Sequence, residues 1–272
     1  MQFLRSEFSL SAKVRIPCYA SRHYSMNSIT LVKELLDEKN SAELTRYLPS
    51  VWNRVWTDDG QFNYANLRLF KTVDKIKNVS NMGVDFRKKQ VLDIGCGDGT
   101  TLMYLRKYFD VKGVGVDISD DVIRELQENI KDENLSFYVG DHRDLSTVTS
   151  NQFDVALSFG VIEHFDEYSL ALSEARRTLK SGGQLVLIQP HLFSFGVVQE
   201  YYLRLIGKWK FGKQRDFSCF HYRSLLRQVG FTNIQFLTRP PYPDMKVTRI
   251  FDSVVKIIIP FWGHYLYLIA KK

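Results

Sequence analysis

An acidic residue followed by three alternate glycines is the pattern in this chain best suited to chemistry: Asp93, Gly95, Gly97 and Gly99. Glycine has no Cβ, so the backbone can turn sharply there and a ligand can lie directly against it. A carboxylate two residues before the first glycine can meet a positively charged group of that ligand. Thr100 stands where the dinucleotide pattern G-x-G-x-x-G has its third glycine. The spacing therefore indicates a nucleotide-type ligand with a cationic end, and not a pyrophosphate.

Two further acids follow later predicted strands. Asp117 ends the segment 112–117, 18 residues beyond Gly99, and Asp141 comes just after the segment 135–139. An acid in the position of Asp117 can accept hydrogen bonds from both hydroxyls of a ribose. The alternative for Asp117 is a place before a helix N-terminus, where negative charge suits the helix dipole. Its position at the end of a strand favours contact with a ligand.

These positions together resemble the class I S-adenosylmethionine-dependent methyltransferases, whose first motif is Asp-x-Gly-x-Gly-x-Gly. Residues 159–165, Phe-Gly-Val-Ile-Glu-His-Phe, closely resemble the segment after the fourth strand in small-molecule methyltransferases of type 11, the ubiquinone-biosynthesis-like group. The resemblance covers about residues 85–238 well and the flanks poorly. It implies S-adenosyl-L-methionine as the cofactor and methyl transfer as the reaction, with no metal.

The resemblance also implies which residues hold that cofactor. Asp93 would meet its amino-acid end, Asp117 its ribose and Asp141 its adenine amino group, while the backbone of His142 would meet a ring nitrogen. The expected cofactor-binding residues are Asp93, Gly95, Cys96, Gly97, Asp117, Ile118, Asp141, His142 and Phe159.

Two histidines are the candidate catalytic residues. Methyl transfer from a sulfonium is an in-line displacement, so the main task is to hold the acceptor atom close behind the methyl carbon. If the acceptor is a hydroxyl, a general base within hydrogen-bond reach would help. His164 and His191 both leave predicted strand ends that should face the pocket. A structural role is the alternative for each of them, His164 ordering its loop by hydrogen bonding.

The elements that must position these residues alternate between strands and helices, which is typical of an α/β fold with a parallel sheet. We expect strands at 91–94, 112–117, 135–139, 153–158, 184–188, 231–237 and 265–270. The resemblance implies a Rossmann-like seven-stranded sheet, mostly parallel with an antiparallel closing strand and with helices on both faces.

The domain organisation that we predict has three parts. Residues 1–28 form a flexible leader, residues 29–85 an N-terminal helical cap, and residues 86–272 the cofactor-binding domain with an insertion at about 239–263. In the cap, Tyr64 and Arg68 are candidates to touch the methionine end of the cofactor. The leader resembles a mitochondrial transit peptide, because basic residues stand among serines with a single acid; an unstructured leader or an upstream start codon before Met26 is the alternative.

Composition sets further bounds. At 272 residues and 44% hydrophobic content the chain is an ordinary globular protein. Its three cysteines, Cys18, Cys96 and Cys219, are far apart and suit a reducing compartment. We therefore expect a cytoplasmic protein, or a protein of the mitochondrial matrix if residues 1–24 are a transit peptide.

Residues 204–272 carry 13 basic and three acidic residues. This basic pole suits an anionic partner, or it is simply a solvated face. The most apolar tract, 254–270, is interrupted and too short to predict a membrane span.

Three functions stay open. The first is methylation of an oxygen or nitrogen in a small-molecule acceptor that is acidic, aromatic or membrane-associated. The second is an RNA or protein methyltransferase that uses the basic pole; against nucleic acid, residues 158–161 read Ser-Phe-Gly-Val where amino-methylating families carry (Asp/Asn)-Pro-Pro-(Tyr/Phe). The third is a non-catalytic module that keeps the cofactor fold. Intact Asp93, Gly95, Gly97 and Asp117 argue against the third. The sequence does not indicate an oligomeric state.

Overall fold

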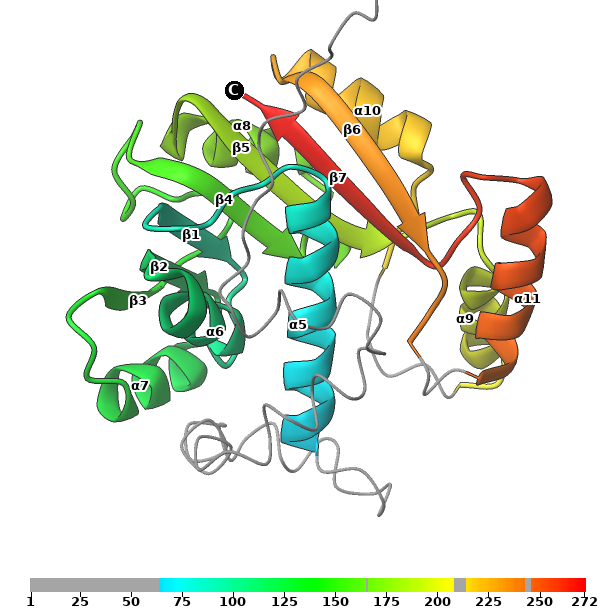
Figure 1. The fold of residues 1–272 in the computed structure, drawn as a ribbon, viewed down its shortest axis with the longest axis horizontal. Helices are drawn as coiled ribbons and strands as arrows, with labels where there is room; N and C mark the ends of the chain where they lie inside the picture. The colour runs from blue at the N-terminus through cyan, green and yellow to red at the C-terminus, as the bar shows by residue number, and fades with distance from the viewer. Residues whose placement is uncertain (1–63, 165, 208–213, 243–245) are drawn as a thin grey trace, which may run out of the picture.

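The computed structural model describes residues 64–164, 166–207, 214–242 and 246–272, which form a single sheet flanked by helices (Figure 1). The strands are β1 (Gln90–Ile94), β2 (Lys112–Asp117), β3 (Leu135–Val139), β4 (Phe153–Phe159), β5 (Leu179–Pro190), β6 (Thr232–Arg239) and β7 (Tyr265–Lys271). The helices are α5 (Tyr64–Asn81), α6 (Thr100–Phe109), α7 (Asp120–Asn129), the short 3-10 helix η1 (Ile162–His164), α8 (Tyr168–Thr178), α9 (Phe195–Leu205), α10 (Cys219–Gln228) and α11 (Lys246–Ile258). The expected leader and residues 29–63 of the expected cap lie outside the described residues.

The strand order is β3-β2-β1-β4-β5-β7-β6. The pairs from β3 through β5 are parallel, whereas β7 runs antiparallel to both of its neighbours, β5 and β6. This confirms the expected sheet of parallel strands with one antiparallel closing strand. The order reverses between β1 and β4, so the carboxyl ends of these two strands border the crevice in which open α/β sheets bind ligands.

The sheet is buried on both faces because its strands carry apolar side chains on alternate sides. In β1, Leu92 and Ile94 pack in one core with residues of α8 and α10. Val91 points the other way and packs in a second core with residues of α5, α6 and α7. The helices thus form a layer on each side of the sheet, as expected.

Two helices were not predicted from the sequence, α9 and α11. The second of them occupies the segment that we expected to be an insertion. Figure 1 shows both helices together at one end of the sheet, past the point where β6 ends and β7 begins. The Phe195 N–H donates a hydrogen bond to Asp252 Oδ1 at 2.9 Å, which ties the start of α9 to the middle of α11.

No helix within the described residues combines the length and the apolar content that crossing a membrane requires.

Candidate functional site

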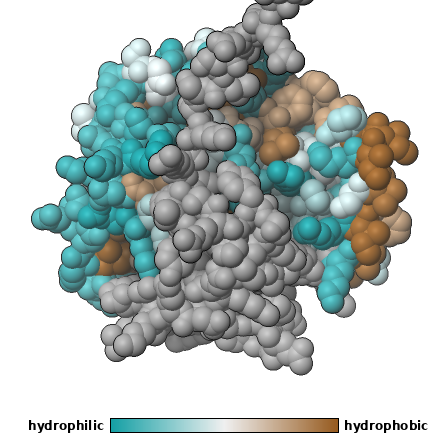
Figure 2. Space-filling model, in the orientation of Figure 1, coloured by the Kyte–Doolittle hydropathy of each residue, from teal (hydrophilic) through white to brown (hydrophobic). Residues whose placement is uncertain are grey.

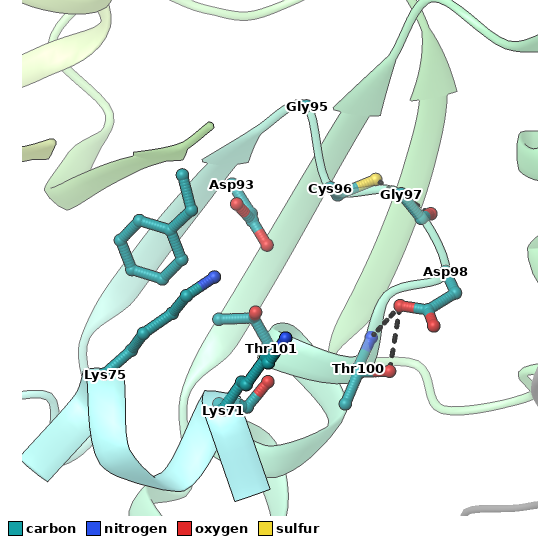
Figure 3. A pocket seen from close by; sticks show the side chains of 11 residues that line it. Lys71, Lys75, Asp93, Gly95, Cys96, Gly97, Asp98, Thr100 and Thr101 are labelled. Carbon is teal, nitrogen blue, oxygen red and sulfur yellow. Dashed lines mark hydrogen bonds between the residues drawn. The ribbon is translucent and has the colours of Figure 1, made fainter. Parts of the chain in front are cut away.

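A cavity of about 260 Å³ lies at the carboxyl ends of β1 and β4, beside the start of α6 and one face of α5 (Figure 3). Its lining combines two glycines of the turn with charged and hydroxyl-bearing side chains from α5, β1, the turn and α6. The lining residues are Lys71, Thr72, Lys75, Asp93, Gly95, Cys96, Gly97, Asp98, Thr100, Thr101 and Phe159. Five of the nine expected cofactor-binding residues are therefore together in this cavity.

The glycine turn has the backbone that only glycine adopts readily. Gly95 and Gly97 have φ angles of 77° and 50°, in the left-handed region. A Cβ on Gly95 would lie 2.3 Å from Cγ2 of Val161, so the loop after β4 packs directly on the turn. A Cβ on Gly97 would meet no protein atom within 4 Å. The open space above Gly97 is room that a ligand can fill.

Asp93, with 3% of its surface exposed, is one of two buried carboxylates that line the cavity. Burial raises the pKa of Asp93 to about 7, with the charge of Lys75 opposing the shift and the charge of Asp117 adding to it. Figure 3 shows Asp93 pointing from β1 into the space that Lys71 and Lys75 enter from α5. A carboxylate and two ammonium groups converging on one cavity can hold a ligand group that carries both charges, as an amino acid does.

At the start of α6, a side chain of the protein itself occupies a backbone N–H group that could otherwise bind a ligand. Asp98 is buried, and its Oδ1 accepts hydrogen bonds from the Thr100 N–H at 3.2 Å and from the Thr100 hydroxyl at 2.8 Å. The protein thus places its own negative charge at the positive end of the helix dipole. An anionic phosphate is disfavoured there, which agrees with the sequence-based argument against a pyrophosphate.

Asp117 is not among the cavity-lining residues, but it shapes the turn. Its Oδ2 accepts a hydrogen bond from the Gly97 N–H at 2.9 Å, and its Oδ1 accepts one from the Ser119 N–H at 3.0 Å. Ser119 is the N-cap of α7, so Asp117 also lies just before a helix N-terminus, as the alternative for this residue proposed. Ile118 follows with most of its side chain exposed.

Asp141 and His142 come directly after β3 and do not line the described cavity. The carboxylate of Asp141 pairs with Arg143 at 2.6 Å, and that guanidinium holds the pKa of Asp141 at about 2. His142 is buried, and burial lowers its pKa below the usual range. Asp141 therefore stays ionised at neutral pH beside a neutral imidazole. Contact of these residues with a ligand stays a prediction.

The end of β4 contributes Phe159 to the cavity. The Lys75 Nζ lies 5.1 Å from the centre of the Phe159 ring, which positions this cation over an aromatic face. In η1, Glu163 is 3% exposed, and burial raises its pKa to about 8. His164 Nε2 lies 3.8 Å from Glu163 Oε1. The His164 side chain is partly exposed beside this buried carboxyl, but it is not among the cavity-lining residues.

His191 has a different environment from the one that we expected. Its ring is fully buried and does not line the cavity. Nδ1 lies 3.1 Å from the Gly263 carbonyl oxygen, and Nε2 accepts a hydrogen bond from the Cys219 N–H at 3.2 Å. Burial lowers the pKa of His191 to about 4. Both nitrogens are engaged by backbone, so the ring links the end of β5 to α10 and to the segment before β7, and it has no geometry for taking a proton from a ligand in the cavity.

Sequence reasoning missed the contribution of α5. It named Tyr64 and Arg68 as candidates to touch the ligand; both lie in the first turns of α5, and their side chains are outside the described part of the chain. Lys71 and Lys75 follow at helical spacing and line the cavity. The signal was present in the sequence, because residues 64, 68, 71 and 75 share one face of a helix.

A protein-family model described as a methyltransferase domain matches residues 92–187. Demethylmenaquinone methyltransferase of Bacteroides fragilis is 24% identical to this chain, over 66% of this chain and 90% of the relative. The family match runs from within β1 to within β5, a range that holds the glycine turn and the acids that follow the strands.

Solved structures show the same fold. A SAM-dependent methyltransferase from Archaeoglobus fulgidus aligns with 74% of this chain and 93% of its own, with a TM-score of 0.56 and 18% identity. Phosphoethanolamine N-methyltransferase 2 of Haemonchus contortus, solved in complex with S-adenosyl-L-methionine, aligns with 89% of this chain and 60% of its own, with a TM-score of 0.57 and 16% identity.

Proposed function

The chain is a class I S-adenosylmethionine-dependent methyltransferase, and from that premise we propose that it methylates an oxygen or nitrogen atom of a small-molecule acceptor. The cofactor supplies a methyl group activated by a sulfonium when it is bound.

The residues of the cavity fit the amino-acid end of this cofactor. Asp93 suits the ammonium group, because a buried carboxylate gains most from a cationic partner. Lys71 and Lys75 suit the carboxylate. Gly97 leaves open space beside the turn, and Asp117 fixes the turn through the Gly97 N–H. Contact of Asp117, Ile118, Asp141 and His142 with the rest of the cofactor is part of the proposal.

The end of β4 and the loop after it support the proposal of a small-molecule acceptor. Ser158 and Phe159 end β4, and Phe159 lines the cavity, so this loop borders any acceptor that reaches the transferred methyl group. The loop lacks the acid- or amide-Pro-Pro-aromatic segment with which amino-methylating nucleic-acid enzymes hold a base. The relatives named above act, by their names, on demethylmenaquinone and phosphoethanolamine, which are small molecules.

The reaction asks little of the protein besides position. The chain must exclude water and hold the acceptor atom in line with the bond that breaks. A neutral amine needs no base before attack, whereas a hydroxyl has to lose its proton. For a hydroxyl acceptor we propose His164 as the base, because it leaves β4 at the cavity end of the sheet beside the buried Glu163.

The acceptor is identified by screening with cofactor labelled in its methyl group. We expect label in a small acidic or aromatic acceptor, or in a polyprenylated ring, and none in RNA or protein. On a hydroxyl acceptor, His164→Ala should lower kcat by about 10²-fold or more, and His221→Ala, an exposed histidine on α10, should not. Label confined to RNA or protein would reject the small-molecule acceptor, and unchanged kcat in His164→Ala would reject the base.

A further inference from the structure

Helix α11 turns its apolar face to solvent. A helix on the surface of a globular protein normally packs its apolar stripe against the core. In α11 the stripe has the helical spacing of three and four residues, yet all of its members are exposed. They are Val247, Ile250, Phe251, Val254, Ile257 and Ile258. Ile257 and Ile258 are 82% and 81% exposed, so the apolar face of α11 contacts solvent and not the core.

Helix α9 repeats this arrangement. Val198, Tyr201, Tyr202 and Leu205 are spaced by three, one and three residues, and all four are exposed. Leu205, at the end of the helix, is 86% exposed. We call the exposed apolar residues of α9 and α11 together the apolar rim. Figure 2 shows the α11 part of the rim as a continuous hydrophobic band along one edge of the molecule.

Polar side chains hold the two helices in this orientation. Asp252, on the opposite side of α11 from the stripe, is fully buried, and its Oδ1 accepts hydrogen bonds from the Phe195 N–H and from Trp262 Nε1 at 2.6 Å. The Thr248 hydroxyl also donates to Gln199 Oε1 of α9 at 3.1 Å. A rotation of α11 that buried its apolar stripe would break these bonds. The exposure is therefore built into the fold.

The charges around the apolar rim are positive. Each helix contains a single acid, Glu200 in α9 and Asp252 in α11, and both are buried. Lys246 and Arg249 are exposed on α11, whereas the exposed Arg204 of α9 pairs with Glu200 at 2.6 Å. The chain after α9 continues with Lys208, Trp209, Lys210, Phe211 and Lys213, whose positions are outside the described residues. Within the described residues of α9 and α11, the apolar stripe is bordered by cations and carries no exposed acid. Such a surface is complementary to a negatively charged surface with an apolar interior.

We propose that α9 and α11 dock the protein on the surface of an anionic lipid bilayer, with the apolar rim in the interfacial layer and the cations at the headgroups. This is how amphipathic helices with basic flanks bind membranes without crossing them. A second copy of the chain is the weaker candidate, because a symmetric contact would bring these cations together. The proposal does not depend on which acceptor is methylated.

The test is flotation of the full chain with vesicles of neutral phosphatidylcholine and with vesicles that also contain phosphatidylglycerol. We expect binding to the anionic vesicles that weakens as salt is raised, because the Debye length shortens from ~30 Å to ~3 Å between 0.01 and 1 M. The double substitution Ile257→Ser/Ile258→Ser should lower the partition coefficient at least about tenfold. Lys246→Gln should lower it about fivefold at low salt.

Leu170→Ser is the matched control, because Leu170 is 51% exposed but lies on α8, away from the apolar rim. It should bind vesicles like the unaltered chain. Retained binding of S-adenosylmethionine shows that each variant is folded. Three results would overturn the proposal: no binding to anionic vesicles, equal losses for Leu170→Ser, or a dimer in lipid-free buffer that the double substitution dissociates.

Discussion

Gly95 illustrates how single residues fix the site. Two constraints act on it: a φ of 77° and the contact that a Cβ would make with Val161 at 2.3 Å. The first constraint belongs to the turn and the second to the loop after β4. Because that loop directly follows Phe159, which ends β4 and lines the cavity, the glycine turn and the end of β4 are coupled at Gly95.

Gly95→Ala should lower the free energy of unfolding by about 2–4 kcal/mol, because backbone strain and a steric clash add. Val161→Ala in the same chain should recover about 1 kcal/mol by removing the clash and leaving the strain. Urea denaturation measures both. Gly182→Ala is the control: Gly182 has a φ of 76° and no atom within 4 Å of a Cβ, so it should cost only the strain. Equal losses at Gly95 and Gly182 would contradict the steric part.

His191 is a second residue whose structural role can be tested by substitution. His191→Ala should lower the free energy of unfolding by about 2–4 kcal/mol, because it leaves buried backbone groups without partners. Since the folded pKa of about 4 lies below the ordinary value, the stability that His191 contributes is present above about pH 6.5 and is lost as pH falls toward 4. Thermal unfolding from pH 4 to 8 shows this. A large loss of kcat with unchanged stability would restore His191 as a base.

Helix α5 forms one wall of the cavity, because Lys71, Thr72 and Lys75 line it. The charge of Lys75 opposes the rise of the Asp93 pKa, and Asp93 must be ionised to attract an ammonium group. The helix thereby connects a segment outside the predicted cofactor-binding domain to the buried carboxylate within it. The matching family model begins at residue 92 and does not include this helix.

Lys75→Gln should raise the pKa of Asp93 above about 7. The affinity for S-adenosylmethionine, which rises with pH as Asp93 ionises, should then reach its plateau at a higher pH than in the unaltered chain. Calorimetric titrations between pH 6 and 9 give the midpoint. Lys77→Gln, an exposed lysine on the same helix, is the control and should leave the midpoint in place. A midpoint that Lys75→Gln does not move would remove α5 from the site.

The 3-10 helix η1 buries Glu163, and no described residue hydrogen-bonds its Oε2. A carboxyl whose folded pKa is raised to about 8 binds its proton more tightly in the folded state. Its contribution to stability is therefore present at low pH and is lost as pH rises toward 8.

Glu163→Gln keeps the shape of the neutral carboxyl and removes this titration. Between about pH 5 and 8 the unaltered chain should lose up to about 1.4 kcal/mol of unfolding free energy per pH unit relative to Glu163→Gln. Urea titrations at several pH values measure the difference. Glu128→Gln, on the exposed side of α7, is the control. Parallel stability curves for Glu163→Gln and the unaltered chain would contradict the burial of a neutral Glu163.

For the whole molecule, the sequence predicted the positions of all seven strands, because strands buried on both faces are apolar runs bounded by turn residues. Their directions were implied by the family resemblance, and the sheet confirms them. The glycine turn and Asp93 were also predicted, since alternate glycines directly after an apolar run permit a sharp turn at the end of a buried strand. The expectation that His191 faces the pocket was wrong, because burial depends on residues distant in sequence, here Cys219 and Gly263.

Helices α9 and α11 escaped prediction for a related reason. Their stripes have helical spacing, but α11 follows three prolines, Pro240, Pro241 and Pro243, and its segment was interpreted as an insertion. That the stripes face solvent follows from the buried Asp252, whose partners lie in α9 and at Trp262. Periodicity in a sequence gives a helix its two faces, and only the tertiary structure shows which face is covered.

The most direct test of the central claim is calorimetric titration of the full chain with S-adenosylmethionine at pH 8, for the unaltered protein, Asp93→Asn and the exposed control Asp121→Asn. We predict one site per chain, with affinity lowered about 10–100-fold in Asp93→Asn, because a charged hydrogen bond contributes about 1.5–3 kcal/mol, and unchanged in Asp121→Asn. No binding to the unaltered chain, or equal affinity in Asp93→Asn, would contradict the assignment of this cavity to the cofactor.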